Sequence, residues 1–468
     1  MTEKYRSDLH FTPRAGWMND PNGLIRIDGV WHLFFQHDPN STSHGPMHWG
    51  HATSTNLVHW AEQPVALYPT ELGTCYSGSA VETADGEIKL FYTAHSRTSE
   101  GDDYEVQCLV HADRSLSFYH AEPANPVVAN PGLIVFRDPK VIWHEPTGRW
   151  IMLITEGQSI GFCGSTDLKS WTYLSSFGDG HGRHGSGPWE CPDLMPLTAP
   201  NGDTVWVLLV GLNTGSYAPG SGTQYFLGQF NGTAFTNANP PETELWLDYG
   251  RDYYAAQTFF ERGGTDKPSV MAWASNWLYA RQTPTTAFRG VMSLPRELRL
   301  VESPDGLRVA ARAPLAAWQA FGAADRPGTS RSDHKADLAV GEELAITLFG
   351  EDQPHFIARR TAIHRGTLRT MRGPVPGMQQ FAHDYAVDFA WPESGALDIT
   401  IFIDRGLVEL SAADGLVWIT NLFYPANPDC CGVTRPSRVD RTFAVKGTAS
   451  RRTARYRSGR SGRPPRRG

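Results

Sequence analysis

The chain has 468 residues, of which 40% are hydrophobic and 19% charged, and its formal net charge is −7. This composition is typical of a globular protein, and no stretch approaches the ~20 apolar residues that a membrane helix needs, which excludes a membrane-embedded chain. The length exceeds the ~100–200 residues of an ordinary domain, so two domains are expected.

The charge is unevenly distributed along the chain. Residues 451–468 hold eight arginines and no acid, so the rest of the chain carries −7 − 8 = −15. A basic tail can bind nucleic acid, but a run of Gly, Pro, Arg and Ser is more often solvated and disordered. We therefore predict a disordered basic tail over residues 448–468 and no nucleic-acid partner.

The N-terminus and the cysteines indicate in which cellular compartment the protein is expected. Residues 1–13 carry charge and no apolar run, so a secretory signal is not expected. The six cysteines lack metal-binding spacing, and free thiols are the default in a reducing compartment. The pairs His48/His51 and His181/His184 have a spacing sometimes seen in zinc sites, but no third zinc ligand accompanies either pair. We predict a cytoplasmic protein, or a secreted one if a leader has been removed, with no metal and no cofactor.

Aromatic and turn-forming residues predict many short strands. The chain has 22 Phe, 16 Tyr and 15 Trp, together with 46 Gly and 33 Pro. Hairpins are expected around Asp28-Gly29, Asp85-Gly86 and residues 145–148. Asp-Gly between alternating apolar runs strongly indicates a hairpin, because the tight turn needs positive φ. Helical periodicity is nearly absent, so the fold class is all-β.

A seven-residue segment occurs twice in the first half of the chain. Residues 54–60 (STNLVHW) and 165–171 (STDLKSW) differ at three positions. Such repeats suggest equivalent turns in a radial array, and the separation, 171 − 60 = 111 residues, corresponds to about two four-stranded blades. The hairpins and the repeat together favour a β-propeller over a single sandwich.

The character of the chain changes after Pro295-Arg296-Glu297-Leu298. Residues 303–332 are rich in Ala and Arg, contain two Pro breaks and are predicted to be a connector. Strand signals then resume at evenly spaced positions, namely 344–349, 385–391, 397–403 and 407–411. Spacing of this kind predicts a sandwich-like β domain over residues 333–447.

Three acids occur in unusual surroundings. Asp20 and Asp138 each precede a proline, and Glu190 lies two residues before one. Proline restricts the preceding residue to extended geometry. The first strands of propeller blades converge on the central channel, so acids at blade starts would meet there. Each motif taken alone could also be an ordinary turn.

Two carboxylates that face one glycosidic bond are the usual equipment for glycoside hydrolysis. One stays ionised to attack, and the other donates a proton to the leaving oxygen. Arg137 beside Asp138 is expected to lower the pKa of that acid and keep it charged, which suits it to hold sugar hydroxyls.

These motifs resemble glycoside hydrolase family 32. The segments 17–23 (WMNDPNG), 136–140 (FRDPK) and 189–194 (WECPDL) look like its three catalytic blocks. The likeness continues through segments 47–52, 76–80, 252–255, 273–277 and 289–298. It is near-continuous from about residue 10 to 300 and looser to about 425. The resemblance implies a five-bladed β-propeller over residues 1–302, followed by a C-terminal β-sandwich.

The resemblance also implies roles for particular residues. Asp20 would be the nucleophile, Glu190 the general acid/base, and Asp138 with Arg137 would hold the fructose hydroxyls. The implied substrate contacts are Asn19, Gln36, His44, Trp49, Tyr76, Ser77 and Trp277. His44 stands where many relatives carry a tryptophan that packs against the sugar.

The sequence thus predicts a retaining exo-β-fructosidase that acts on levan- or inulin-type fructans, fructo-oligosaccharides and sucrose. One alternative keeps the site but prefers sucrose or transfers fructose to another sugar. A second is a fructan-binding propeller without catalysis, which the presence of all three acids argues against. An inverting five-bladed pentosidase is more distant, because the 19–23 block (NDPNG) speaks against it. A small carbohydrate is the only predicted partner, and the oligomeric state is left open.

Overall fold

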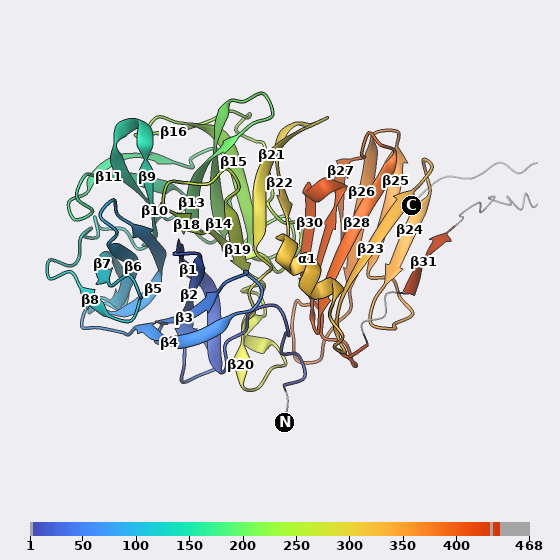
Figure 1. The fold of residues 1–468 in the computed structure, drawn as a ribbon, viewed down its shortest axis with the longest axis horizontal. Coiled ribbons are helices and arrows are strands. Elements are labelled where there is room, and N and C mark those ends of the chain that lie inside the picture. Colours follow the sequence, from blue (N-terminus) through green and yellow to red (C-terminus); the bar gives the residue numbers. More distant parts are fainter. Residues whose placement is uncertain (1–2, 431–433, 440–468) are drawn as a thin grey trace, which may run out of the picture.

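Five antiparallel sheets surround a common axis in the N-terminal part of the chain, and two further sheets form a sandwich beside them (Figure 1). The computed structural model describes residues 3–430 and 434–439. The fold is therefore the predicted all-β class, a five-bladed propeller followed by a β-sandwich. The predicted tail at 448–468 lies outside the described residues. No helix within the described residues combines the length and apolar character needed to cross a bilayer.

The five blades follow one another along the chain, and their first strands contact each other in a closed ring around the axis. Blades I and II comprise β1 (Gly16–Ile27), β2 (Val30–Asp38), β3 (His48–Ser54), β4 (Ala61–Leu67), β5 (Thr74–Glu82), β6 (Ile88–Arg97), β7 (Asp103–Ala112) and β8 (Tyr119–Ala121). Blades III and IV comprise β9 (Phe136–His144), β10 (Arg149–Glu156), β11 (Ile160–Ser165), β12 (Thr172–Phe177), β13 (Trp189–Thr198), β14 (Thr204–Leu212), β15 (Gly222–Phe230) and β16 (Phe235–Asn237). Blade V comprises β17 (Tyr254–Thr258), β19 (Ser269–Trp273), β21 (Arg296–Ser303) and β22 (Gly306–Arg312).

Segments from the end of the propeller pair with its first blade. Strands β18 (Phe260–Glu261) and β20 (Phe288–Arg289) both run parallel to β1, with Ile25 opposite Phe260 and Gly16 opposite Phe288. This pairing covers backbone groups that a free edge would expose. The ring is thereby closed between its last and first blades.

The predicted hairpins and the repeat are confirmed. Asp28 and Gly29 both have positive φ, as the tight turn between β1 and β2 requires. The two repeated segments form the same turn after the third strand of blades I and III, two blades apart as predicted. In both turns the leucine has positive φ, 65° at Leu57 and 64° at Leu168.

The sandwich consists of two packed sheets. One contains β23 (Thr329–Asp337), β28 (Ala396–Asp404), β29 (Leu407–Ala412) and β30 (Val417–Leu422), and the other contains β24 (Glu343–Thr347), β25 (Phe356–Ala362), β26 (Arg365–Arg372), β27 (His383–Ala390) and β31 (Thr434–Val439). The remaining helical elements are α1 (Leu315–Gly322) and the 3-10 turns η1 (Glu145–Thr147), η2 (Ala280–Gln282) and η3 (Ala413–Gly415). The sandwich core joins apolar residues of both sheets, such as Phe356 and Leu368 with Ile401 and Leu410.

The structure corrects the predicted connector at 303–332. Its first part is strand β22, which pairs with β21 across the turn at Pro304-Asp305 and completes blade V. Helix α1 follows, and the sandwich already begins at Thr329 with β23. Composition misled the prediction, because alanines in β22 and α1 are buried in a core cluster that joins blades IV and V to the sandwich.

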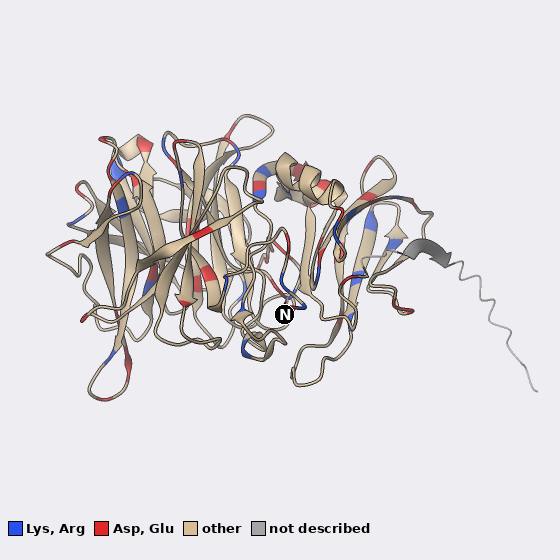
Figure 2. Ribbon diagram, turned by 60° about the horizontal axis from the view of Figure 1, so that its bottom comes forward, with Lys and Arg blue, Asp and Glu red and all other residues tan. Residues whose placement is uncertain are grey.

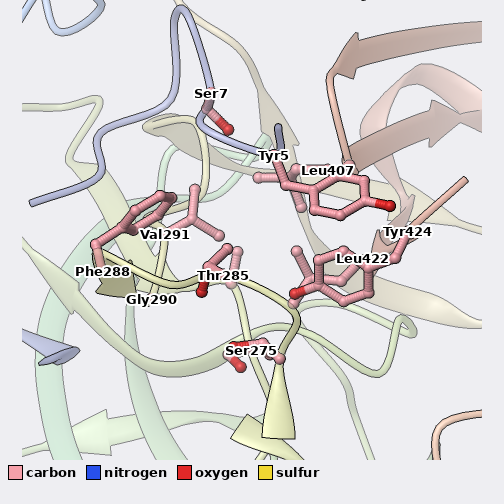
Figure 3. Close-up of a pocket in the computed structure, with 13 residues that line it drawn as sticks. Tyr5, Ser7, Ser275, Thr285, Phe288, Gly290, Val291, Leu407, Leu422 and Tyr424 are labelled. Carbon is pink, nitrogen blue, oxygen red and sulfur yellow. The ribbon is translucent and has the colours of Figure 1, made fainter. Parts of the chain in front are cut away.

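The N-terminal segment lies at the junction of the two domains (Figure 2). Residues from this segment, from the propeller and from the sandwich enclose a cavity there, lined among others by Tyr5, Phe288 and Leu422 (Figure 3). Its volume of about 20 Å³ is close to that of a single water site, so it is a packing space and not a substrate site.

Buried charges at this junction are paired across the two domains. Arg296 of the propeller donates to Glu409 of the sandwich at 2.6 Å and to Asp248 at 2.8 Å, and all three side chains are fully buried. His10 lies between Asp404 (2.8 Å) and Glu409 (3.2 Å). Burial alone would lower the pKa of His10, but the hydrogen bonds to both acids raise it to about 9. Breaking one partner of such a buried network is strongly destabilising.

We expect His10→Gln to destabilise the protein more at acidic than at alkaline pH. Because the pKa of His10 is higher in the folded chain, its contribution is fully present below about pH 6.5 and is lost as the pH passes about 9. The contribution amounts to at most about 3 kcal/mol. Calorimetric melting of both proteins near pH 6 and near pH 9.5 measures it. An equal loss of stability at both pH values would contradict the assignment.

Candidate active site

The innermost strand of every blade is interrupted by a β-bulge at the same end of the channel. In each case two residues of the inner strand lie opposite one residue of the next strand. The bulged pairs are Asn19 and Asp20, Tyr76 and Ser77, Asp138 and Pro139, Cys191 and Pro192, and Ala255 and Ala256. Because a bulge re-aims side chains, successive residues of one strand can reach the same site.

Three of these bulges hold a non-glycine residue at positive φ. The angles are 62° at Asp138, 49° at Cys191 and 55° at Ala255. Such conformations cost of order 1–2 kcal/mol each and persist only where the surroundings impose them. Here they are supported by hydrogen bonds between blades: the Asp138 amide donates to Thr93 Oγ1 at 2.9 Å, and the Cys191 amide donates to Asp138 at 3.0 Å.

The bulges surround a cavity of about 340 Å³ in which the three predicted acids meet. The predicted residues that line it are Asn19, Asp20, Gln36, His44, Tyr76, Ser77, Arg137, Asp138, Glu190 and Trp277. Four lining residues were not predicted, namely Asp103, Glu105, Asn213 and Arg281. Trp49 is fully buried behind the wall, where its indole N–H donates to the Tyr76 carbonyl at 2.9 Å. Trp49 therefore supports Tyr76 and does not line the cavity.

Asp20 is a buried carboxylate with one free oxygen. Its Oδ2 accepts a hydrogen bond from Ser77 Oγ at 2.7 Å, and Cys191 Sγ lies 3.6 Å from the same oxygen. Its Oδ1 has no hydrogen-bond partner among the described residues. Burial raises the pKa of Asp20, and the charge of Glu190 adds to the increase, while the hydrogen bond from Ser77 opposes it. A buried lone pair without a donor is available to a reacting group.

Glu190 is held by donors on both of its oxygens. Arg137 donates to Oε1 from Nε at 3.1 Å and from Nη2 at 2.7 Å. Asn213 donates to Oε2 at 2.9 Å, and the Tyr254 hydroxyl donates to the same oxygen. The carboxylate is thus fixed in orientation at the edge of the cavity.

Arg137 lowers the pKa of Asp138 as expected, but the expectation that Asp138 stays charged is wrong, because burial outweighs the guanidinium. Burial raises the pKa of Asp138 to about 8; Arg137 opposes the increase, whereas the charges of Glu190 and Asp20 add to it. The guanidinium is hydrogen-bonded to Glu190 and, at 2.9 Å, to Glu105, which is fully buried. The sequence could not show that Asp138 is buried beside two further acids, which is what raises its pKa.

Aromatic rings form one wall of the cavity. Trp277 stacks on Trp17 with a centroid separation of 5.9 Å, and Tyr76 stacks on His95 at 4.2 Å. His44 bridges the two pairs, in edge contact with Trp277 at 5.6 Å and with Tyr76 at 6.0 Å. Burial lowers the pKa of His44 to about 4, and the positive charge of Arg281 contributes, so the ring is neutral near pH 7. His44 thus completes the aromatic wall.

A layer of buried polar side chains follows the bulges along the inner strands. Lys140, Asp193 and Thr258 lie two residues or fewer beyond the bulges of blades III, IV and V. Asp193 Oδ2 lies 3.0 Å from Lys140 Nζ and accepts from Thr258 Oγ1 at 2.7 Å. This layer links blades III, IV and V.

Sequence reasoning missed Tyr254, Asn213 and Glu105. Tyr254 directly precedes the bulge of blade V, the position that Arg137 and Glu190 hold in blades III and IV. Aligning the starts of the five blades could have found it. Asn213 and Glu105 come from later strands or loops of their blades and leave no comparable signal. Among the described residues, no group of three or more His, Cys, Asp or Glu side chains is arranged to hold a metal ion.

Comparison with known proteins identifies relatives along most of the chain. Residues 10–310 match the family model "Glycosyl hydrolases family 32 N-terminal domain", and residues 356–450 match "Glycosyl hydrolases family 32 C terminal". A levanase of Bacillus subtilis is 44% identical over a match that covers 66% of this chain and 46% of the levanase, so the match spans about half of that relative. An extracellular exo-inulinase of Aspergillus ficuum is 32% identical, with 91% of this chain and 90% of that protein covered. The crystal structure of an exo-inulinase from Aspergillus awamori has a TM-score of 0.80, 26% identity and coverage of 93% of this chain and 97% of that one.

The raised pKa of Asp138 leads to a prediction about stability. The folded chain retains a proton on Asp138 up to about pH 8, whereas the unfolded chain loses it near pH 3.8, so the wild type loses stability as the pH rises through this range. Asn has no proton to lose. The melting temperature of Asp138→Asn, relative to the wild type, should therefore increase between about pH 4 and pH 8.

Thermal unfolding across this pH range tests the prediction, with Asp352→Asn as the matched control because Asp352 is exposed. If the difference in melting temperature between Asp138→Asn and the wild type does not change with pH, Asp138 is ionised at little cost in stability.

Proposed function

Because the chain belongs to glycoside hydrolase family 32, we propose that it is a retaining exo-β-fructosidase. Its substrates are terminal, non-reducing β-D-fructofuranosyl residues of levan- or inulin-type fructans, fructo-oligosaccharides and sucrose. The observation that carries the proposal is the convergence of Asp20, Asp138 and Glu190 in one cavity. The levanase and exo-inulinase relatives support the substrate class.

The shape of the cavity favours attack at a chain end. Its volume of about 340 Å³ suits a terminal sugar residue with part of its neighbour. An internal fructosyl residue would need room for the chain on both sides. We therefore expect the release of single fructose units.

Asp20 acts as the nucleophile in the first step. Its Oδ1 attacks the anomeric carbon C2 while the bond between C2 and the leaving oxygen breaks, and Glu190 transfers its proton to that oxygen. Ser77 holds the other oxygen of Asp20 in place. In the second step a water molecule gives a proton to Glu190 and attacks C2, which breaks the ester to Asp20 and releases β-fructose.

Asp138 and Arg137 bind the fructose hydroxyls. With a pKa of about 8, Asp138 carries a proton near neutral pH and can both donate and accept hydrogen bonds. A neutral Asp138 also removes one negative charge from beside Asp20, and neighbouring buried carboxylates resist simultaneous ionisation. Asn19, Gln36 and Tyr76 supply further polar contacts from the same wall.

We also propose that the chain acts in a reducing compartment. The five cysteines among the described residues form no disulfide, and four of them are buried. Free thiols are usual in the cytoplasm. The exo-inulinase relative is extracellular by name, so the cytoplasmic location stays a prediction, as does the oligomeric state.

Product analysis tests the proposed activity. The purified chain is incubated separately with sucrose, inulin-type oligosaccharides and levan, and products are separated by chromatography over time. We expect fructose as the only small product from the fructans, and kcat at least about 10⁴-fold lower for Asp20→Ala with the fold retained. Activity on sucrose alone would make the protein an invertase, and new oligosaccharides would make it a transferase. Release that survives Asp20→Ala would overturn the assignment of the nucleophile.

A further inference from the structure

A second and larger cavity lies at the opposite end of the propeller strands. It has a volume of about 1090 Å³, roughly three times that of the active-site cavity, and we call it the distal cavity. Its walls are the β5–β6 turn, the β9–β10 hairpin, the turn after β11 and strand β18. Asp138 and Trp143 occupy opposite ends of β9, five residues or about 17 Å apart along the strand. The two cavities are therefore separate.

Trp143 gives the distal cavity an exposed aromatic surface. It is the only exposed tryptophan in the described part of the chain, with 41% of its surface accessible to solvent. Its ring packs edge to face on Trp150, its cross-strand partner, at 5.1 Å, and its indole N–H donates to Glu145. The exposed indole is thus held in one orientation without a ligand, and a preorganised ring loses little entropy on binding. Flat rings of this kind cover the apolar faces of sugars.

Polar groups on the facing walls are arranged as a chain of donors and acceptors. Lys89 Nζ lies 2.6 Å from His111 Nδ1, His111 Nε2 lies 3.0 Å from Glu122, and Lys169 lies 2.7 Å from the same carboxylate. Because the lysine donates to Nδ1, the imidazole donates from Nε2. A polyol has both donors and acceptors and can bond to such a chain at several points.

Charge excludes an anionic ligand. Six acids and three bases line the distal cavity. Each base is already paired: Lys89 with Glu87, Lys169 with Glu122 and Arg262 with Glu82. No cation in the lining is thus left free for a phosphate or a carboxylate, whereas a neutral carbohydrate meets no such repulsion.

We propose that the distal cavity is a second carbohydrate-binding site, which holds an internal segment of a fructan chain while its ends are cut at the active site. The identity of the carbohydrate rests on the proposed function. A long chain retained at one end of the propeller raises the effective concentration of its ends at the other. Sucrose is too short to gain from this effect, so the site discriminates between polymer and disaccharide.

Binding is tested in an Asp20→Asn background, in which substrate is not cleaved. Native gels cast with levan or with inulin measure the retardation of each variant. We expect Asp20→Asn to be retarded and the double variant with Trp143→Ala to migrate nearly as in a gel without polysaccharide. Tyr173→Ala is the matched control, because Tyr173 is also an exposed aromatic residue but lies outside the cavity. Its double variant should be retarded like Asp20→Asn alone.

Kinetics of the active enzyme give a second readout. Trp143→Ala should lower kcat/KM for the polymer by about 3- to 10-fold and leave kcat/KM for sucrose within about 2-fold of wild type. Trp143→Phe, which keeps an aromatic face, should restore most of the loss and serves if the alanine variant folds poorly. Melting temperatures of all variants check the fold.

Two results would overturn the proposal: no retardation of Asp20→Asn in either gel, or equal retardation with and without Trp143. Parallel loss on sucrose and polymer would also overturn it, because Trp143 would then support the fold or the active site. The proposed function fails by a different result, namely that the wild type releases no fructose from any of the three substrates.

Discussion

The site depends on one backbone irregularity that is repeated in all five blades. In a regular strand Asn19 and Asp20 would point to opposite faces and pack into different blades. The bulge places both at the channel, and its equivalents add Tyr76, Ser77 and Asp138. The propeller therefore brings acids from positions 20, 138 and 190 of the sequence into one cavity of about 340 Å³.

The buried acids and strained bulges lower the stability of the fold, and interactions elsewhere in the fold compensate for this loss. Two buried carboxyls with raised pKa values and three non-glycine residues at positive φ lie around one cavity. The Lys140–Asp193 layer ties blades III, IV and V together. Parallel pairing of β18 and β20 with β1 closes the ring, and the Arg296–Glu409 pair fixes the sandwich against it. Acids so confined are suited to chemistry because their protonation states differ from those in water.

Local signals in the sequence predicted the elements that depend on local rules. Asp28-Gly29 predicted a hairpin because only certain residues tolerate its turn, and the repeated 54–60 segment placed its copies two blades apart. Ten of the eleven predicted site residues line the cavity, and eight of these ten belong to blocks that resemble the family, the exceptions being Gln36 and His44. Side-chain direction could not be predicted: Arg137 contacts Glu105 and Glu190, which lie on other blades, and Trp49 turns behind Tyr76. Alanine-rich β22 was missed because its burial is created by the second domain.

The most direct test of the mechanism is the anomeric configuration of fructose at the moment of release. The attack of Asp20 on C2 inverts the configuration of this carbon once. The attack of water, activated by Glu190, inverts it a second time, so the configuration is retained overall. NMR recorded during rapid hydrolysis of sucrose should therefore show β-fructofuranose first, with the other forms appearing only by later equilibration. An α-anomer as the first product would mean a single displacement by water, and would contradict a covalent role for Asp20.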